Sequence, residues 1–230
     1  MIRKTLLWFC LCAGVVLWAQ TTAPEQGTRK EILVNDRVHV ASAVLPAHGS
    51  TPLHRHDRDF LVIPLDDAKL TNHEEGKPAA EVVLHRGEPV LIKGGFSHLE
   101  TNEGDAAVHL TVVEFLAPQG VVKKITFEPS KFCNQGSATA CVSEKYLFCS
   151  EKMCVSSVEF GPGVATEMHT HSTPHMVIAL TDMEIKDQEE GRPAVTRNLK
   201  SGEVFYQPAG ITHALVNGSK TAKFITVLWQ

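Results

Sequence analysis

Residues 202–217 read GEVFYQPAGITHALVN, and residues 87–102 read GEPVLIKGGFSHLETN. The two segments lie 115 positions apart and share the first glycine, a histidine and the final asparagine. The shared histidines are His98 and His213. A fixed offset that preserves glycines and histidines without a gap predicts a duplicated domain, and the repeated unit carries residues that can hold a metal ion.

The same offset holds far outside these two segments. It aligns His54 with His169 and His56 with His171, and it repeats the run EEGKPA as EEGRPA. A Gly-Pro turn flanked by charges is a surface loop, so its return predicts the same hairpin in both halves.

Length and composition fit two ordinary globular domains. The chain of 230 residues is 43% hydrophobic and 21% charged, with a formal net charge of −4. The duplication divides it into two units of roughly 100 residues, each large enough to bury its own core. The sequence after residue 19 has no basic tract of the kind that nucleic-acid binding needs, so we expect no nucleic-acid partner.

The N-terminus predicts export. Basic residues near the start are followed by an apolar stretch over residues 5–19 and a polar run over residues 20–27. This is the layout of a secretory signal peptide, cleaved near Ala19. A membrane anchor is the alternative, but the apolar stretch falls short of the roughly 20 residues of a spanning helix. We therefore expect residues 1–19 to be removed, residues 20–28 to be a linker, and the protein to be periplasmic or extracellular, without membrane contact after cleavage.

Four cysteines remain after cleavage, all near the junction of the halves. An even number of cysteines in an oxidising compartment predicts two disulfides, although four cysteines allow three pairings. One of these pairs the two closest cysteines in a tight hairpin. A thiolate metal site is the alternative, but the spacing lacks the close pairs of zinc ribbons. The four are Cys133, Cys141, Cys149 and Cys154.

Short runs rich in Val, Ile, Leu, Phe and Thr between turn signals predict β-strands. No segment has sustained helical periodicity with a cap, so helix should be scarce. Many short strands with regular turns indicate an all-β sandwich or barrel. In the first half we expect strands at Arg37–Leu45, Phe60–Pro64, Glu81–Leu84, Pro89–Ile92 and Val108–Phe115.

Domain limits follow from the repeat. We expect the first domain at residues 29–116 and the second at residues 144–230. The connector at residues 117–143 contains a strand-like run at residues 121–127 and then a loop rich in Gly, Ser, Ala and Thr.

The histidines of the second half form a constellation. His169 and His171 lie two apart on a predicted strand, so both imidazoles project from one face. His175 follows a turn, and His213 comes from a distant strand. A local cluster with one remote ligand is how a β scaffold surrounds an ion, and imidazole suits zinc, copper, iron and nickel.

These residues resemble the cupin superfamily, whose two segments run G-x5-H-x-H-x3,4-E-x6-G and G-x5-P-x-G-x2-H-x3-N. The second segment is matched in full by Gly202, Pro208, Gly210, His213 and Asn217. In the first half it is matched except at Lys93, where proline is expected. The resemblance covers roughly residues 29 to 230 and implies a bicupin, with two tandem double-stranded β-helix (jelly-roll) barrels.

The resemblance also implies metal ligands, and the departures from it alter their charge. His175 and Phe60 stand at the glutamate positions of the two halves. A four-imidazole shell leaves the ion's full charge on bound water or substrate and favours anionic ligands. Phe60 leaves open positions in the first half, or fills the barrel of a degenerate repeat. The implied ligands are His169, His171, His175 and His213 in the second half, and His54, His56 and His98 in the first.

Two carboxylates are candidate acids or bases. Glu167 shares strand parity with His169, and Glu100 stands two residues after His98. A carboxylate near a metal is a reasonable general base, while a solvated position at the rim is the alternative for each.

The resemblance implies a secreted metalloenzyme of oxygenase, lyase or isomerase type acting on a small polar or anionic substrate. The alternative is a non-catalytic protein that binds a carboxylate or sugar through its metal. An ion acquired outside the cytoplasm is first expected to be zinc or copper, with iron, nickel and manganese also open. Two fused repeats already supply the pairing that single-domain cupins obtain by dimerising, so both a monomer and a homodimer are consistent with the sequence.

Overall fold

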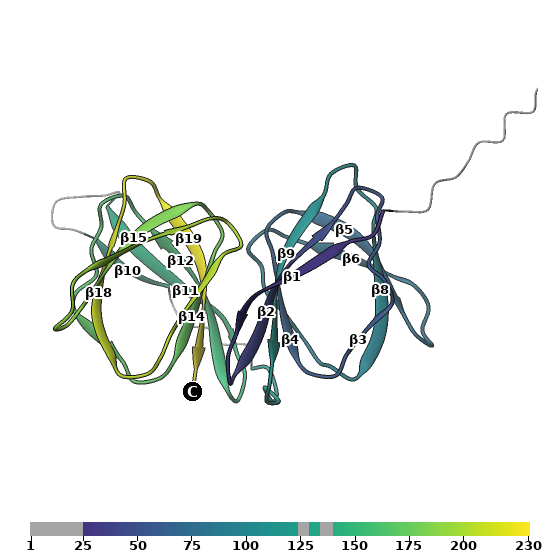
Figure 1. The fold of residues 1–230 in the computed structure, drawn as a ribbon, viewed down its shortest axis with the longest axis horizontal. Helices are drawn as coiled ribbons and strands as arrows, with labels where there is room; N and C mark the ends of the chain where they lie inside the picture. Colours follow the sequence, from purple (N-terminus) through teal and green to yellow (C-terminus); the bar gives the residue numbers. More distant parts are fainter. Residues whose placement is uncertain (1–24, 124–128, 134–139) are drawn as a thin grey trace, which may run out of the picture.

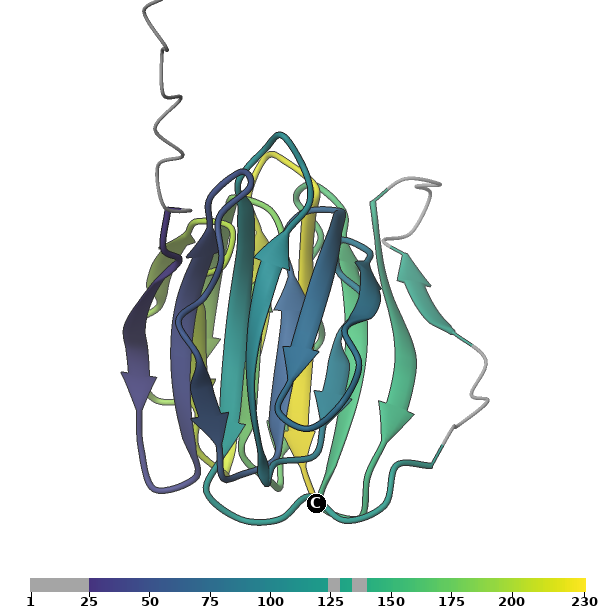
Figure 2. The ribbon, with the colours of Figure 1, turned by 90° about the vertical axis from the view of Figure 1, so that its right-hand side faces the viewer.

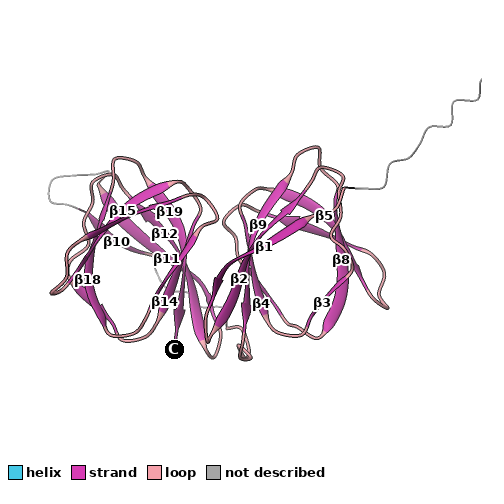
Figure 3. Ribbon diagram, viewed as in Figure 1, coloured by secondary structure: helices cyan, strands magenta, loops and turns pink. Residues whose placement is uncertain are grey.

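The computed structural model describes residues 25–123, 129–133 and 140–230. These residues form strands, turns and loops and contain no helix, as expected (Figures 1 and 3). Accordingly, the described part of the chain has no helix long and apolar enough to cross a membrane. The predicted signal peptide, most of the predicted strand at residues 121–127 and most of the loop that follows it lie outside the described residues.

The described strands form two barrels. The N-terminal barrel contains β1 (Thr28–Val34), β2 (Val38–Leu45), β3 (His54–His56), β4 (Phe60–Pro64), β5 (Ala68–Glu74), β6 (Ala80–Leu84), β7 (Val90–Ile92), β8 (Phe96–Asn102) and β9 (Val108–Phe115). The C-terminal barrel contains β10 (Ser130–Cys133), β11 (Cys141–Cys149), β12 (Met153–Phe160), β13 (His169–His171), β14 (His175–Ala179), β15 (Met183–Glu189), β16 (Val195–Leu199), β17 (Val204–Gln207), β18 (Ile211–Asn217) and β19 (Ala222–Trp229).

The strand predictions for the first half are confirmed, with ends that shift by at most one residue. Each barrel closes one larger sheet against a four-stranded sheet. The larger sheets have the orders β1-β2-β9-β4-β7 and β10-β11-β12-β19-β14-β17, and the smaller sheets β3-β8-β5-β6 and β13-β18-β15-β16. The connector expected at residues 117–143 contributes β10 and the start of β11 to the second barrel.

The two larger sheets also pack against each other, which joins the barrels (Figure 1). Side chains alternate along each strand of these sheets. One set faces the neighbouring barrel, and the other faces the interior of the barrel to which the strand belongs. On β12, Met153 and Val155 belong to the shared core, whereas Val158 and Phe160 belong to the core of the second barrel. The sheets are therefore apolar on both faces.

Two glycines of the repeat lie at this junction. Gly87 and Gly202 have positive φ angles of 74° and 87°. A Cβ on Gly87 would lie 2.9 Å from Leu180, and a Cβ on Gly202 would lie 2.7 Å from Leu65. Since Leu65 and Leu180 are themselves related by the offset, the contact occurs twice and relates the halves by a pseudo-two-fold axis. Figure 2 agrees, with β1 (purple) at one edge of the stack and β10 and β11 (green) at the other.

All four cysteines of the junction are in disulfides. Cys133 is bonded to Cys141 and Cys149 to Cys154, which fixes β10 to β11 and closes the hairpin of β11 and β12. The alternative of a thiolate metal site is therefore wrong, because no thiolate remains to bind an ion.

Candidate metal centres

The N-terminal barrel brings three histidines together. His54 and His56 lie on β3, two residues apart, and His98 on β8 pairs directly with His54. One donor nitrogen from each lies within 4.8 Å of the others. The Nε2 atoms of His54 and His56 are 3.0 Å apart. The antiparallel pairing of β3 with β8 thus brings the imidazole of His98 next to those of His54 and His56.

The protonation of these rings fits a cation. The Pro52 carbonyl, 2.9 Å from Nδ1 of His54, can only accept a hydrogen bond, so a neutral His54 carries its proton on Nδ1 and a lone pair on Nε2. Nδ1 of His98 is 2.7 Å from Oδ1 of Asn72, and its buried Nε2 has no hydrogen-bond partner among the described residues. Lone pairs that converge in this way repel one another unless a cation lies between them.

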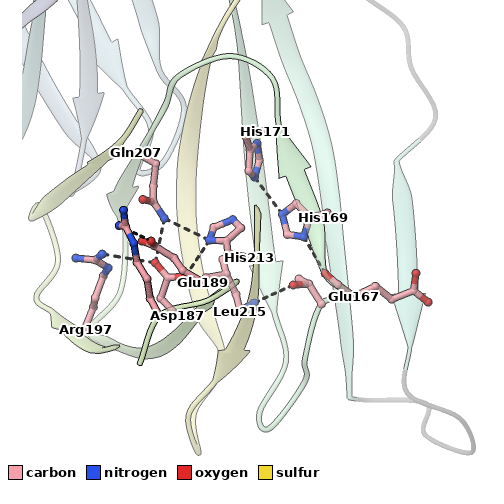
Figure 4. A network of polar contacts seen from close by, with 11 residues as sticks. Glu167, His169, His171, Asp187, Glu189, Arg197, Gln207, His213 and Leu215 are labelled. Atoms are coloured by element: carbon pink, nitrogen blue, oxygen red, sulfur yellow. Dashed lines mark hydrogen bonds and ion pairs between the residues drawn. The ribbon is translucent and has the colours of Figure 1, made fainter. Parts of the chain in front are cut away.

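The C-terminal barrel repeats the arrangement. His169 and His171 on β13 face His213 on β18, and one donor nitrogen of each lies within 4.8 Å of the others. Nδ1 of His169 donates to the Glu167 carbonyl at 2.8 Å, and the Nε2 atoms of His169 and His171 are 3.0 Å apart (Figure 4). The buried Nε2 of His213 is also unpartnered within the described chain.

Burial keeps four of the clustered imidazoles neutral at neutral pH. Desolvation, followed by the neighbouring histidines, lowers the pKa of His56 to about 4, with the positive charge of Arg29 a smaller cause. Desolvation likewise lowers the pKa of His98 and His171 to about 4 and that of His175 to about 3. Neutral imidazole is the form that binds metal ions, so His56 and His98 in one triad and His171 in the other are in the form that a ligand needs.

His175 and Phe60 occupy the same place in the two barrels. The Phe60 ring stacks on His56 at 3.8 Å between centroids, and the His175 ring lies 3.9 Å from that of His171. His175 is outside the group of three whose donor atoms converge, and its ring centroid is 6.1 Å from that of His213. Its buried Nδ1 has no partner among the described residues. A role as fourth ligand stays a prediction.

Behind His213 lies a buried polar network that the sequence reasoning missed. Asp187 accepts from Nδ1 of His213 at 2.9 Å, from Gln207 at 2.9 Å and from Arg197 at 3.5 Å (Figure 4). The side chains of His213 and Asp187 are 0% and 1% exposed. A carboxylate behind a ligating imidazole fixes its tautomer and raises its basicity.

The N-terminal barrel lacks this network. At the corresponding positions, Asn72 replaces Asp187, and the apolar residues Val82 and Ile92 replace Arg197 and Gln207. The offset contained this signal, because it aligns Asn72 with Asp187. However, neither residue has the spacing of a ligand, so nothing in the sequence connected them to the histidines.

The two candidate carboxylates differ in their placement. Glu100 borders the same cavity as the N-terminal triad, and burial raises the pKa of its carboxyl group. The C-terminal counterpart of Glu100 is Leu215. Glu167 is exposed, and its carboxylate points away from the C-terminal triad (Figure 4). Glu167 lines the C-terminal cavity with its carboxylate turned from the histidines, so of the two carboxylates only Glu100 lines a cavity that touches all three histidines of its triad.

A cavity of about 250 Å³ opens beside the N-terminal triad and touches His54, His56 and His98. A cavity of about 570 Å³ in the C-terminal barrel reaches His169. Phe60 is one of the apolar residues that line the first cavity, and Ser130, Glu144 and Thr166 are polar residues that line the second.

Neither the sequence models of known protein families nor the curated proteins include a match to this chain. Solved structures do match it. A cupin 2 conserved barrel domain protein from Leptotrichia buccalis has a TM-score of 0.55 and 14% identity, covering 91% of this chain and 92% of its own. A mutant of oxalate decarboxylase from Bacillus subtilis has a TM-score of 0.61 and 14% identity, covering 88% and 72%.

Salicylate 1,2-dioxygenase from Pseudaminobacter salicylatoxidans has a TM-score of 0.58 and 11% identity, covering 87% of this chain and 76% of its own. These likenesses extend across both barrels and establish the fold, which is that of two-domain cupins. At such identities they carry no information on substrate.

Proposed function

We propose that this protein with the bicupin fold is a secreted metalloenzyme that acts on a small polar or anionic molecule at the N-terminal triad, while the C-terminal triad holds a structural ion. The observation that carries the proposal is the N-terminal cavity, which touches all three histidines and the half-buried Glu100. Two disulfides and the signal-like N-terminus support export.

The division of labour rests on what surrounds each triad. Catalytic metal sites keep open positions, whereas structural sites are closed by protein ligands. In the C-terminal barrel, His175 offers a fourth imidazole and Asp187 holds His213 rigidly. In the N-terminal barrel, Phe60 offers no ligand atom. A divalent ion held by these three imidazoles would supply a Lewis acid, for which zinc and copper are the first candidates and iron, nickel and manganese the others.

The chain's own residues supply the remaining functions. Glu100 lies two residues beyond His98 on β8, and its carboxylate is the acceptor placed to remove a proton from a substrate in the cavity. Its backbone N–H donates to the Thr51 hydroxyl at 2.9 Å, which fixes this part of the strand. Phe60 and Val62 form part of the apolar wall of the cavity.

A non-catalytic binding protein is the second candidate. His175 favours it, because a centre completed by a fourth imidazole leaves less room for a substrate. In that case both ions stabilise the barrels or anchor a carboxylate or sugar.

The test combines metal analysis with a substrate screen. We expect two ions per chain in the wild type and one in each of His98→Ala and His213→Ala. Turnover should be lost in His98→Ala and in Glu100→Gln but retained in Glu167→Gln, the matched control whose carboxylate points away. Less than one ion per wild-type chain contradicts both candidates. Full metal content without turnover, together with a much lower melting temperature after chelation, favours the binding protein.

A further inference from the structure

The corresponding strands β1 and β11 of the two larger sheets have the same register with their neighbours β2 and β12. On β1, Arg29 pairs with Ala43 of β2, and on β11, Glu144 pairs with Val158 of β12. Both pairs are related by the offset of 115 positions. The repeat has therefore kept this position in the fold and inverted its charge.

Arg29 belongs to the N-terminal cavity. Ala43 packs with the core of that barrel, so Arg29, opposite it, is on the interior face of the sheet. The cavity touches both Arg29 and the three histidines, so a molecule that fills it contacts the guanidinium and the metal centre together. No ion pair or hydrogen bond involves the Arg29 side chain within the described part of the chain. The guanidinium is therefore available to a ligand.

The rest of the lining sets the ligand's shape and charge. Leu45, Phe60, Val62, Leu110 and Val112 form an apolar wall. Glu100 supplies the one carboxylate among the described residues that line the cavity, and it lies beside His98. An anionic end therefore belongs near Arg29. The cavity volume of about 250 Å³ admits a body of one small ring or branched chain.

The C-terminal cavity has the opposite character. Glu144 lines it and accepts a hydrogen bond from Ser156 at 2.6 Å, which holds the carboxylate in place. Glu167 lines the same cavity. Two carboxylates with no arginine or lysine among the described lining residues repel an anion.

We propose that the two barrels select ligands of opposite charge, and that the N-terminal cavity takes a small carboxylate with an apolar body, held by Arg29, which the C-terminal cavity rejects. The substrate role of this carboxylate rests on the proposed function, but its binding site does not. Guanidinium and carboxylate match in a bidentate geometry, which favours this anion class.

The test uses the full-length mature protein, loaded with zinc, and three probes of one shape. Benzoate, benzamide and benzamidinium differ in charge but hardly in size. We expect isothermal titration to give one benzoate site per chain, with benzamide bound at least about tenfold more weakly, as for loss of a charge-assisted hydrogen bond. Arg29→Gln should weaken benzoate by a similar factor and bring it level with benzamide.

Lys30→Gln is the matched control. Lys30 is the next residue on β1 and faces the opposite side of the sheet, so the same loss of charge should leave benzoate binding within about twofold. Arg29→Glu should abolish benzoate binding and improve that of benzamidinium. Thermal melts of all variants check that they are folded.

The inference and the proposed function fail separately. If benzoate does not bind the wild type at millimolar concentration, or if Arg29→Gln and Lys30→Gln affect it equally, the inference is overturned even when both triads hold zinc. If the protein holds no zinc but Arg29 still governs benzoate binding, the inference stands and the proposed function fails.

Discussion

Replacing Asp187 by asparagine tests whether the buried network behind His213 sets the affinity of the C-terminal centre. Asparagine is the residue that the N-terminal half has at this place, and it nearly preserves the shape of aspartate. Asp187 accepts from His213 with one oxygen and from Gln207 and Arg197 with the other. In Asp187→Asn one of these positions becomes an NH₂ group that faces a donor.

The magnitude follows from the hydrogen bond at 2.9 Å between Asp187 and His213. A bond to a charged acceptor contributes about 1.5–3 kcal/mol, compared with about 0.5–1.5 kcal/mol for a neutral one. The difference of about 1–1.5 kcal/mol corresponds to roughly tenfold weaker zinc binding, the lower end of the 10- to 100-fold range for such partners of metal ligands. The unmet donor also costs about 1–3 kcal/mol of folding stability.

The assay is zinc titration in competition with a chromophoric chelator, in a His98→Ala background where only the C-terminal centre remains. Asp182→Asn is the control, because Asp182 is an exposed carboxylate that pairs with Lys200 at the surface. Urea unfolding of the metal-free proteins separates affinity from stability. A change in zinc affinity of less than twofold in Asp187→Asn, with the fold intact, would refute the reasoning.

Three further results are expected. Gly202→Ala combines a strained positive φ with a close contact across the barrel junction, so it should cost about 2–4 kcal/mol in urea unfolding, whereas Gly191→Ala, with positive φ but open space, should cost about 1–2 kcal/mol. Serine at Cys149 and Cys154 should lower the unfolding free energy by about 2 kcal/mol, and reductant should affect this variant less than the wild type. The metal-free protein should lose stability as the pH falls from about 6.5 to about 4, because in this range the buried histidines bind protons only in the unfolded chain. Circular dichroism at stepped pH, with and without zinc, checks this expectation. Bound zinc should reduce the loss of stability at every pH above that at which its ligands become protonated.

The repeat made the barrels and the triads predictable from sequence. Strand pattern located β4 and β9, and the offset placed His54 and His98 where the fold needed two strands to meet. These features could be predicted because the two halves can be compared with each other. A weak pattern that recurs at the same offset in both halves has independent support.

Other features could not be predicted from the sequence, because they depend on which surfaces of the two barrels pack against each other. The identity of Leu65 and Leu180 was visible, but no pattern within one half shows that each packs on a glycine of the other. Arg29 and Glu144 escaped for a different reason. They differ in charge, so a search for what the halves share passes over the position at which they diverge.

The role of His175 as a fourth ligand stays a prediction, because its spacing in sequence does not fix the positions of its ring nitrogens. The family pattern places a ligand there, and the structure places the ring beside His171, outside the converging group. Spacing in sequence identifies which barrel wall a residue occupies, whereas ligation depends on a few ångströms within that wall.

The paired contacts of Gly87 with Leu180 and of Gly202 with Leu65 have a consequence for inheritance. In an assembly of identical subunits, one codon change alters both copies of such a contact. Here each copy of the contact has its own codons, so a mutation alters only one of the two contacts. The unaltered contact continues to hold the barrels in register. Each half can therefore change in sequence while the other half maintains the packing between the barrels. Under this condition one position of the repeat can come to carry opposite charges in the two barrels.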